Sequence, residues 1–481
     1  MARDNNVSRK ENGINIRAVA LDILLSYEKG EDKSHKLLGA VLNKYDYLSS
    51  SDKSFLKRLT EGTVEYSIKL DYIINEFSGT PVSRMKPVIR QVIRMSVYQI
   101  MYMDRVPDRA VCDEAVKLVK KRGLGGLSGF VNGVLRAIIR GRDDIKWPDP
   151  DKDEIPALSV EYSCPEHIVR SLIDDYGRDR AISCLEASLL PDRMTYLRID
   201  ESLPEERVKE IRTKIVSDDA TSADDAKYSS DATGPEEYIT GFISDPDLPD
   251  VIRNMFYAAG TVKTDRVMRH KEFAEGLITV QDISSQLVCE LAGFEELGKT
   301  EGAEILDVCS APGGKSMHAA SKLKRYGING SILSLDISDA KQDITKENIR
   351  RMHLDDLISA DVWDATVFNE RFADRFDLVL ADVPCSGLGV MGRKADIKYN
   401  MTEAVMSDIV TLQHKILDNA VRYVRVGGRI IFSTCTMRRA ENDLGVEYIL
   451  KRGGYRLIRK AQLFLSRYND GFFIAVLERF T

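Results

Sequence analysis

Five short apolar runs in the C-terminal half of the chain constrain its fold more than any other feature. They are rich in Ile, Leu, Val and Phe, and segments with helical periodicity separate them; the runs are 304–308, 331–336, 377–382, 429–434 and 472–478. Strands this apolar along their whole length occur in sheets that helices cover on both faces. The alternation therefore predicts an α/β domain over residues 276–481. In such domains ligands bind beyond the carboxyl ends of the strands.

A glycine-containing loop, SAPGGKS (310–316), follows the first of these runs. Gly313 and Gly314 would let a ligand approach the backbone closely, and the helix that follows would present free N–H groups. A nucleotide-binding P-loop would need a glycine where Cys309 stands, and the dinucleotide pattern G-x-G-x-x-G is absent as well. A glycine turn without any ligand is the alternative to a binding loop.

Acidic residues follow the next strands. Asp336 ends the second run, about twenty residues after the glycines, where an acid typically binds the hydroxyl pair of a ribose. Capping of the following helix is the alternative, and the spacing favours the ribose. Asp361 and Asp364 lie further along, and either could meet an adenine amino group. Helix capping or turn formation would explain these two acids equally well.

Two cysteines lie in loops that directly follow apolar runs. Cys385 stands in ADVPCSG (381–387) together with Asp382, and Cys435 stands in STCT (433–436). A cysteine is most often a buried structural residue, but the Pro, Ser and Gly around Cys385 indicate a turn. AEN (440–442), after Cys435, could open a helix, and helix N-terminal amides lower the pKa of a thiol. These loops predict a reaction centre with two thiols and an acid.

Composition limits the class of protein. Seven cysteines without a C-x-x-C pair argue against a disulfide framework and a structural zinc site. No apolar stretch is long enough to span a bilayer, and the N-terminus lacks the apolar core of a signal peptide, so we expect a cytoplasmic protein.

The charge is unevenly distributed. The net charge is −6, but residues 1–140 carry 24 Lys and Arg against 16 Asp and Glu, a net of +8, which leaves −14 for the remainder. A basic N-terminal part permits RNA contact, although a solvated helical surface would explain the same charge.

The chain reads as three parts. Apolar residues at helical spacing continue through residue 140 without strand alternation, which predicts a helical bundle. The segment 141–156, rich in proline and acids, is the expected linker. The next part mixes helical stretches with strand-like runs at 194–200 and 237–243, and its acidic stretch 217–237 is expected to be a surface loop. The predicted domains are 1–145 (helical), 157–275 (small α+β) and 276–481 (α/β).

These features together resemble the RNA cytosine-5 methyltransferases that use S-adenosylmethionine. The motifs that carry the resemblance are CSAPGGK, the LD of the second run, ADVPCSG, RKADIKY (393–399), STCT followed by EN, and DGFFIAVLER (470–479). The N-terminal helices are similar to the NusB type of RNA-binding domain. A NusB-like domain before such a catalytic domain is the arrangement of the ribosomal RNA small subunit methyltransferase B, or Sun, family.

The resemblance implies a Rossmann-like, S-adenosylmethionine-dependent methyltransferase domain and assigns roles to residues. Cys435 would be the nucleophile and Cys385 would help to release the product, with Asp382 and Lys315 completing the catalytic group. The cofactor-binding residues would be Cys309, Ser310, Ala311, Pro312, Gly313, Gly314, Lys315, Asp336, Asp364 and Asp382. Asp361 is an alternative to Asp364, because the family usually has a single acid there. The implied partner is small-subunit ribosomal RNA, with no metal, no membrane and a monomeric chain.

Two other functions stay open at this point. The same chemistry could act on transfer RNA, and the basic NusB-like part favours ribosomal RNA only by analogy. An RNA-binding regulatory protein with an inactive methyltransferase-like body is the second alternative. The presence of both cysteines, Asp382 and the glycine loop argues against it.

Overall fold

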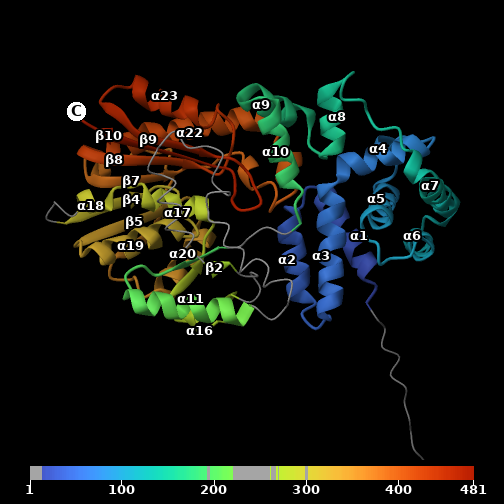
Figure 1. Cartoon of the computed structure of the whole chain (residues 1–481), viewed down its shortest axis with the longest axis horizontal. Coiled ribbons are helices and arrows are strands. Elements are labelled where there is room, and N and C mark those ends of the chain that lie inside the picture. The colour runs from blue at the N-terminus through green and yellow to red at the C-terminus, as the bar shows by residue number, and fades with distance from the viewer. Residues whose placement is uncertain (1–13, 192–195, 220–259, 262–266, 269, 298–301) are drawn as a thin grey trace, which may run out of the picture. The chain divides into compact units, whose positions relative to one another are not determined.

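The computed structural model of the chain describes residues 14–191, 196–219, 260–261, 267–268, 270–297 and 302–481 (Figure 1). The chain divides into two compact units, Met1–Arg170 with Lys394–Tyr399 and Ser171–Arg393 with Asn400–Thr481. Among the described residues, every helix is too short or too polar to cross a membrane.

The first unit is helical throughout its described residues. Its helices are α1 (Ile16–Glu28), α2 (Ser34–Lys44), α3 (Ser50–Glu65), α4 (Ser67–Phe77), α5 (Pro87–Tyr102), α6 (Asp108–Lys121), α7 (Ser128–Gly141) and α8 (Glu154–Glu161), and α9 (Glu166–Tyr176) begins in it. The apolar faces of α1 to α7 form one buried core. Gly62 in α3 permits the closest approach within it, because a Cβ there would stand 2.0 Å from the ring of Tyr98. The predicted bundle is confirmed, and α2 is a helix that the periodicity did not reveal.

A short segment from the C-terminal half belongs to this first unit. Within Lys394–Tyr399, Asp396 is 0% and Lys398 is 2% exposed. A carboxylate oxygen of Asp396 accepts a hydrogen bond of 3.1 Å from the backbone N–H of Ser34. The hydroxyl of Tyr399 lies 2.7 Å from the carbonyl oxygens of both Glu65 and Ser163. Nothing in the sequence indicated that RKADIKY would be built into the helical unit.

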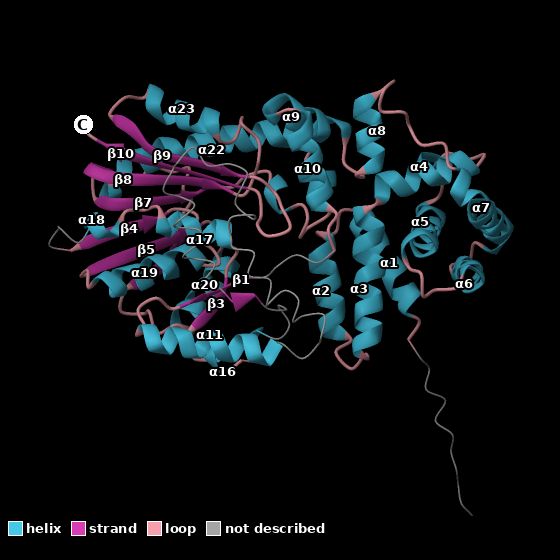
Figure 2. Ribbon diagram, in the orientation of Figure 1, coloured by secondary structure: helices cyan, strands magenta, loops and turns pink. Residues whose placement is uncertain are grey.

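The second unit is organised around a seven-stranded sheet in the order β6-β5-β4-β7-β8-β10-β9 (Figure 2). The strands are β4 (Ala303–Asp307), β5 (Gly330–Asp336), β6 (Ile358–Val362), β7 (Phe376–Asp382), β8 (Val424–Thr434), β9 (Tyr455–Leu463) and β10 (Phe472–Arg479). The pairs from β6 to β8 are parallel, whereas β10 runs antiparallel to both of its neighbours.

Helices cover both faces of this sheet, because successive residues of a strand point to opposite sides. Ile305 and Leu378 pack in a core with α17 (Ile283–Glu290) and α19 (Gly314–Tyr326). Their neighbours Leu306 and Val379 pack in a separate core with α22 (Glu403–Tyr423) and α23 (Asp443–Lys451). The predicted α/β, Rossmann-like architecture is confirmed, and all five predicted strands are present.

Two strands of the sheet were not predicted. β6 and β9 are its edges, and edge strands commonly carry polar and charged side chains. β9 contains Arg456, Arg459 and Lys460, and β6 is largely exposed. Neither sequence therefore has the continuous apolar character of the central strands.

A smaller antiparallel sheet precedes the large one. It has the order β2-β1-β3, from β1 (Tyr196–Ile199), β2 (Gly260–Thr261) and β3 (Ile278–Val280), and α10 (Arg178–Ser188), α11 (Glu205–Asp219) and α16 (Lys271–Ala274) lie around it in the sequence. β1 falls within the predicted run 194–200. The predicted run 237–243 lies outside the described residues, as does the acidic stretch 217–237 beyond its first three residues, which end α11.

Candidate active site

The two thiols that are fifty residues apart in the sequence lie next to each other beyond the carboxyl ends of two central strands. Cys385 follows β7 and Cys435 follows β8, and these neighbouring parallel strands pair Asp382 with Ser433. The two sulfur atoms are 3.2 Å apart, and both side chains are half-buried. The sheet register thus explains why motifs at two strand ends form one site.

Hydrogen bonds hold the two loops together. The Ser386 and Thr436 hydroxyls are 2.8 Å apart, and the backbone N–H of Ser386 donates to the carboxylate of Glu441 at 2.7 Å. The Gly389 N–H donates to the Cys435 carbonyl at 3.0 Å, and the Gly471 N–H donates to the Gly389 carbonyl at 2.9 Å. The thiols therefore sit on a fixed frame that also includes the start of the last strand.

The helix that AEN (440–442) was expected to open is present, since α23 begins at Asp443 with Asn442 as its N-cap residue. It does not follow Cys435 directly. In the turn between them, the side-chain amide of Asn442 donates to the Thr436 carbonyl and its oxygen accepts from the Thr434 hydroxyl.

A lysine and a carboxylate lie beside the thiols. The Lys315 Nζ is 2.6 Å from one oxygen of Asp382, and the Ser433 hydroxyl donates to the other oxygen at 2.8 Å. Burial by itself would lower the pKa of Lys315, but the charge and hydrogen bond of Asp382, together with nearby Asp307, raise it overall. Cys435 is close enough to act on Lys315 in the same direction. Lys315 is thus a largely buried cation that is bonded to the acid and close to the thiol.

Asp307 is a residue of this site that the sequence reasoning missed. It ends β4, is 0% exposed, and accepts a hydrogen bond of 2.7 Å from the Ser316 hydroxyl. Its other oxygen has no hydrogen-bond partner among the described residues. Burial raises the pKa of Asp307 to about 7. An acid inside the apolar run EILDV was the signal that could have revealed it.

The glycine loop and the second acid lie against each other. Asp336, 7% exposed, accepts from the backbone N–H groups of Ala311 at 3.3 Å and Ser338 at 3.1 Å. The side-chain cap of α20 (Asp339–Arg351) is Ser338, so Asp336 is not the helix cap that was its alternative role. Gly313 has φ +94° and a Cβ there would lie 2.9 Å from Thr345, which restricts this position to glycine.

The loop also offers room and unsatisfied groups. A Cβ at Gly314 would meet no atom within 4 Å, and Gly314 begins α19 with its free N–H groups. The hydroxyl of Ser310 is buried without a hydrogen-bond partner in the described part of the chain. Burial raises the pKa of Cys309 well above its usual value, so this thiol stays neutral.

The two candidate acids near β6 differ in their surroundings. Asp361 is exposed on the edge strand, where its neighbour Val362 pairs with Asp336. Asp364 accepts from the backbone N–H of Thr366 at 2.9 Å and from the Thr366 hydroxyl at 2.7 Å. The turn that was one alternative for Asp364 is therefore present, and the choice between the two acids stays a prediction.

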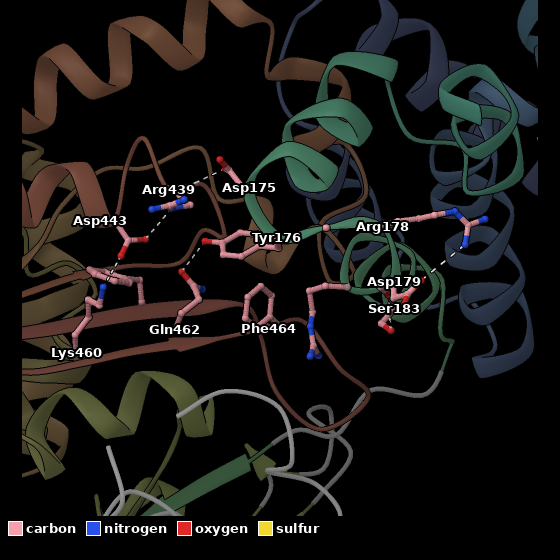
Figure 3. Close-up of a pocket in the computed structure, with 13 residues that line it drawn as sticks. Asp175, Tyr176, Arg178, Asp179, Ser183, Arg439, Asp443, Lys460, Gln462 and Phe464 are labelled. Carbon is pink, nitrogen blue, oxygen red and sulfur yellow. Dashed lines mark hydrogen bonds and ion pairs between the residues drawn. The ribbon is translucent and has the colours of Figure 1, made fainter. Parts of the chain in front are cut away.

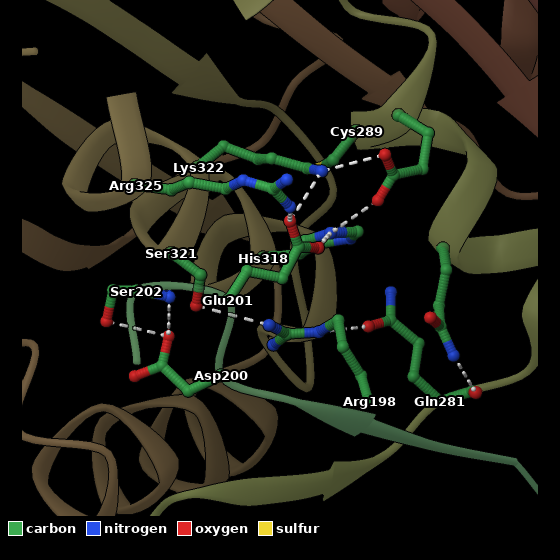
Figure 4. Close-up of polar contacts among 12 residues, drawn as sticks. Arg198, Asp200, Glu201, Ser202, Gln281, Cys289, His318, Ser321, Lys322 and Arg325 are labelled. Atoms are coloured by element: carbon green, nitrogen blue, oxygen red, sulfur yellow. Dashed lines mark hydrogen bonds and ion pairs between the residues drawn. The ribbon is translucent and has the colours of Figure 1, made fainter. Parts of the chain in front are cut away.

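A second charged cluster lies along α19 (Figure 4). Glu201, Glu290 and His318 are residues of the types that bind metals, and their ligand atoms lie within 4.8 Å of one another. The Lys322 Nζ, however, is 2.7 Å from both carboxylates, and Arg325 also pairs with Glu201 at 2.7 Å. Because cations already neutralise the carboxylates, we interpret the cluster as an ion-pair network that supports α19.

Comparisons with known proteins match both units. The family model described as 16S rRNA methyltransferase RsmB/F matches residues 295–477, and the NusB family model matches residues 14–140. A Bacillus subtilis protein described as a probable ribosomal RNA small subunit methyltransferase B is 33% identical over 429 residues, covering 89% of this chain and 86% of that protein.

Two further relatives extend the comparison. The ribosomal RNA small subunit methyltransferase B of an Escherichia coli strain is 26% identical, covering 84% of this chain and 83% of that protein. Among solved structures, the crystal structure of PH0851 superposes with a TM-score of 0.72 at 19% identity, covering 97% of this chain and 99% of that one. This last likeness concerns the fold alone.

Proposed function

Because the chain belongs to the ribosomal RNA small subunit methyltransferase B family, we propose that it transfers a methyl group from S-adenosylmethionine to carbon-5 of a cytosine in small-subunit ribosomal RNA. The observation that carries the proposal is the pair of thiols, Cys385 and Cys435, with sulfur atoms 3.2 Å apart beside the Lys315–Asp382 pair. Two thiols at one site suit a reaction in which one adds to the base and the other assists its release.

The residues around the glycine loop fit the cofactor. The open space at Gly314 and the unpartnered hydroxyl of Ser310 form a cradle for its methionine end, within the segment Cys309–Lys315. Asp336 would hold the ribose, Asp364 or Asp361 the adenine, and Asp382 would line the site. When bound, the cofactor supplies an electrophilic sulfonium methyl group.

The chain's own residues then carry out the remaining chemistry. Carbon-5 of cytosine is a weak nucleophile, and addition of the Cys435 thiolate to carbon-6 converts the ring into an enamine that can attack the methyl group. Asp382, as an acid, would hydrogen-bond to ring nitrogen-3 and stabilise the developing charge. Lys315, whose Nζ is 2.6 Å from Asp382, would stay a cation beside the ring, because its pKa is raised.

The raised pKa of Cys385 supports the proposal that Cys435 is the nucleophile and that Cys385 helps to release the product. The hydrogen bond to Cys435 and burial together raise the pKa of the Cys385 thiol well above its usual value. A thiol that stays protonated is a poor nucleophile but can exchange a proton with a neighbour. Cys385 would therefore orient a water that takes the carbon-5 proton, after which the Cys435 sulfur leaves as a thiolate.

The thiol variants test this proposal. Cys435→Ala should transfer no methyl group and form no covalent RNA adduct, because the attacking sulfur is gone. Cys385→Ala should let Cys435 attack and methylate, then stall, and leave a denaturant-resistant protein–RNA complex on a gel. Cys112→Ala, which removes a buried thiol of the first unit, is the matched control and should behave as wild type. An adduct that accumulates in Cys435→Ala instead would reverse the two roles.

A separate experiment tests whether ribosomal RNA or transfer RNA is the substrate. We propose that the basic first unit contributes affinity for ribosomal RNA through phosphate contacts, which weaken as salt increases. Bisulfite sequencing of total RNA from cells with and without the gene should show one lost 5-methylcytosine in small-subunit RNA. A loss confined to transfer RNA would favour that alternative, and no loss together with RNA binding would favour a regulatory protein.

A further inference from the structure

A cavity of about 900 Å³ lies in the second unit, and its lining residues include neither the two thiols nor the cofactor loop (Figure 3). Its walls come from the end of α9, the start of α10, the segment after Cys435 and strands β9 and β10. A volume of this size is typical of pockets that bind small molecules or nucleotides. The roles proposed above do not use it.

The cavity wall is bonded to the loop that carries Cys435. Gln462 lines the cavity, and its side-chain oxygen accepts a hydrogen bond of 2.8 Å from Asn442. Asn442 also donates to the carbonyl of Thr436, the residue after Cys435. Phe473, another wall residue, pairs in the sheet with Thr434. A ligand in the cavity would therefore lie beside the proposed nucleophile.

Basic side chains line this space together with the carboxylates of Asp175, Asp179 and Asp443. The guanidinium of Arg439 is 53% exposed and lies 3.8 Å from Asp443, and the backbone N–H of Arg439 donates to Asp175 at 3.1 Å. The distance of 3.8 Å is too long for a hydrogen bond, so the guanidinium donors are available to a ligand. Lys460 lines the same space and is paired with Asp443 at 2.6 Å. The uncapped N-terminus of α10, which starts after Gly177, adds a partial positive charge.

Aromatic rings complete the cavity. Tyr176 and Phe464 pack edge to face with centroids 4.6 Å apart, and the guanidinium of Arg180 lies 5.2 Å above the Phe464 ring. The Tyr176 hydroxyl donates to Gln462 at 3.3 Å, which fixes the orientation of its ring. Basic groups beside aromatic rings are the combination with which proteins hold single-stranded nucleic acid.

We propose that this cavity binds an unpaired nucleotide next to the target cytosine, with its phosphate on Arg180 and Arg439 and its base against Tyr176. The proposal rests on the proposed function, because a target base must leave its stack to reach a thiol, and its neighbours on the strand must then be held elsewhere. The cavity thus determines which unpaired segment can present a cytosine to Cys435.

The test uses the full chain and transcribed small-subunit ribosomal RNA containing 5-bromouridine. Arg180→Gln with Arg439→Gln should lower the slope of log Kd against log salt concentration by about 0.7, the value for one lost single-strand phosphate contact. Tyr176→Leu should weaken binding about 5- to 150-fold through lost stacking, whereas Tyr176→Phe should bind as wild type. Arg456→Gln removes an arginine that is 62% exposed on the same strand as Lys460, and it is the matched control.

Photocrosslinking gives an independent readout. Irradiation should attach the transcript to the tryptic peptide that contains Tyr176, and crosslinks found only in other peptides would overturn the proposal. Pocket variants with the same affinity and salt slope as Arg456→Gln would overturn it as well, as would a wild-type chain that does not bind the transcript. If the wild type crosslinks at Tyr176 but forms no methylated product, the result supports nucleotide binding in the cavity and contradicts the proposed methyl transfer. If the wild type methylates the RNA and the pocket variants match the control, only the proposal that the cavity binds a nucleotide is contradicted.

Discussion

At the scale of single residues, the buried acid Asp307 should make stability depend on pH. Its pKa is raised from 3.8 to about 7 in the folded chain by burial. The folded state therefore holds a proton that the unfolded state has released between about pH 4 and 7. The free energy of unfolding is therefore highest below this pH range. It decreases as pH rises through the range, by up to about 1.4 kcal/mol per pH unit.

Asp307→Asn should flatten this dependence. Guanidinium denaturation at several pH values between 4.5 and 7.5 would compare the free energy of unfolding of the variant with that of the wild type. Asp339→Asn changes an exposed acid at the start of α20 and should keep the wild-type slope. Parallel curves for Asp307→Asn and the wild type would contradict the raised pKa.

Asp336 is the residue on which cofactor affinity should depend most clearly. Asp336→Ala should weaken binding of S-adenosylmethionine roughly 10- to 100-fold, as expected for a lost hydrogen bond to a charged group, while the fold is retained. Isothermal titration calorimetry measures the affinity, circular dichroism checks the fold, and Asp339→Ala is the matched control. An unchanged affinity would remove Asp336 from the site.

Asp361 and Asp364 can be separated by the same measurement. Only the acid that contacts the adenine should lower the affinity when it is replaced by alanine. Asp364→Ala also removes the turn with Thr366, so Asp364→Asn, which keeps the acceptor oxygen, distinguishes a lost turn from a lost ligand contact.

At the scale of elements, the frame that holds the two thiol loops depends on Gly389. A Cβ there would lie 1.8 Å from the Gly471 carbonyl oxygen and 2.7 Å from that of Cys435. Both neighbours are backbone, so the loops must separate, at a cost of about 1–3 kcal/mol for overpacking. Gly389→Ala should lower the denaturation midpoint and slow methyl transfer.

A matched glycine tests whether the effect is local. Gly133→Ala in α7 adds a Cβ in open space and should leave stability unchanged or raise it by about 0.5–1 kcal/mol, because alanine favours the helix. Wild-type activity and stability in Gly389→Ala would mean that the close contacts do not fix the thiols.

How far the sequence predicts an element depends on where that element is buried. The central strands have covered faces and read as apolar runs, so their carboxyl ends, with Asp382, Cys385 and Cys435, could be placed together in advance. The edge strands β6 and β9 mix polar and apolar residues and gave no such signal. The helix that AEN (440–442) was expected to open is present as α23, but the hydrogen bond from Asn442 to the Thr436 carbonyl in the turn before it had no signal in the sequence.

At the scale of the whole molecule, local sequence patterns could not predict which segments pack against residues far away in the sequence. Residues 394–399 follow the Cys385 loop in the sequence, yet they are built into the helical unit. Their burial depends on backbone groups hundreds of residues away, such as the N–H of Ser34 and the carbonyl of Glu65. No periodicity or motif in the segment specifies those partners.

The last prediction concerns this inserted segment. Tyr399→Phe removes the hydroxyl that lies 2.7 Å from the carbonyl oxygens of Glu65 and Ser163, and leaves buried acceptors without a donor. The first unit should lose about 1–3 kcal/mol of stability. The chain has two tryptophans, Trp147 in the first unit and Trp363 in the second, so each unit has its own fluorescent reporter once the other is replaced by phenylalanine.

Urea denaturation followed by fluorescence would then separate the units. Tyr399→Phe should lower the midpoint reported by Trp147 more than the one reported by Trp363, because the lost contacts are all internal to the first unit. Tyr47→Phe, at a side chain that is 73% exposed, is the matched control and should change neither midpoint. A shift seen only by Trp363 would mean that the segment stabilises the catalytic unit instead, and that the helical unit folds without it.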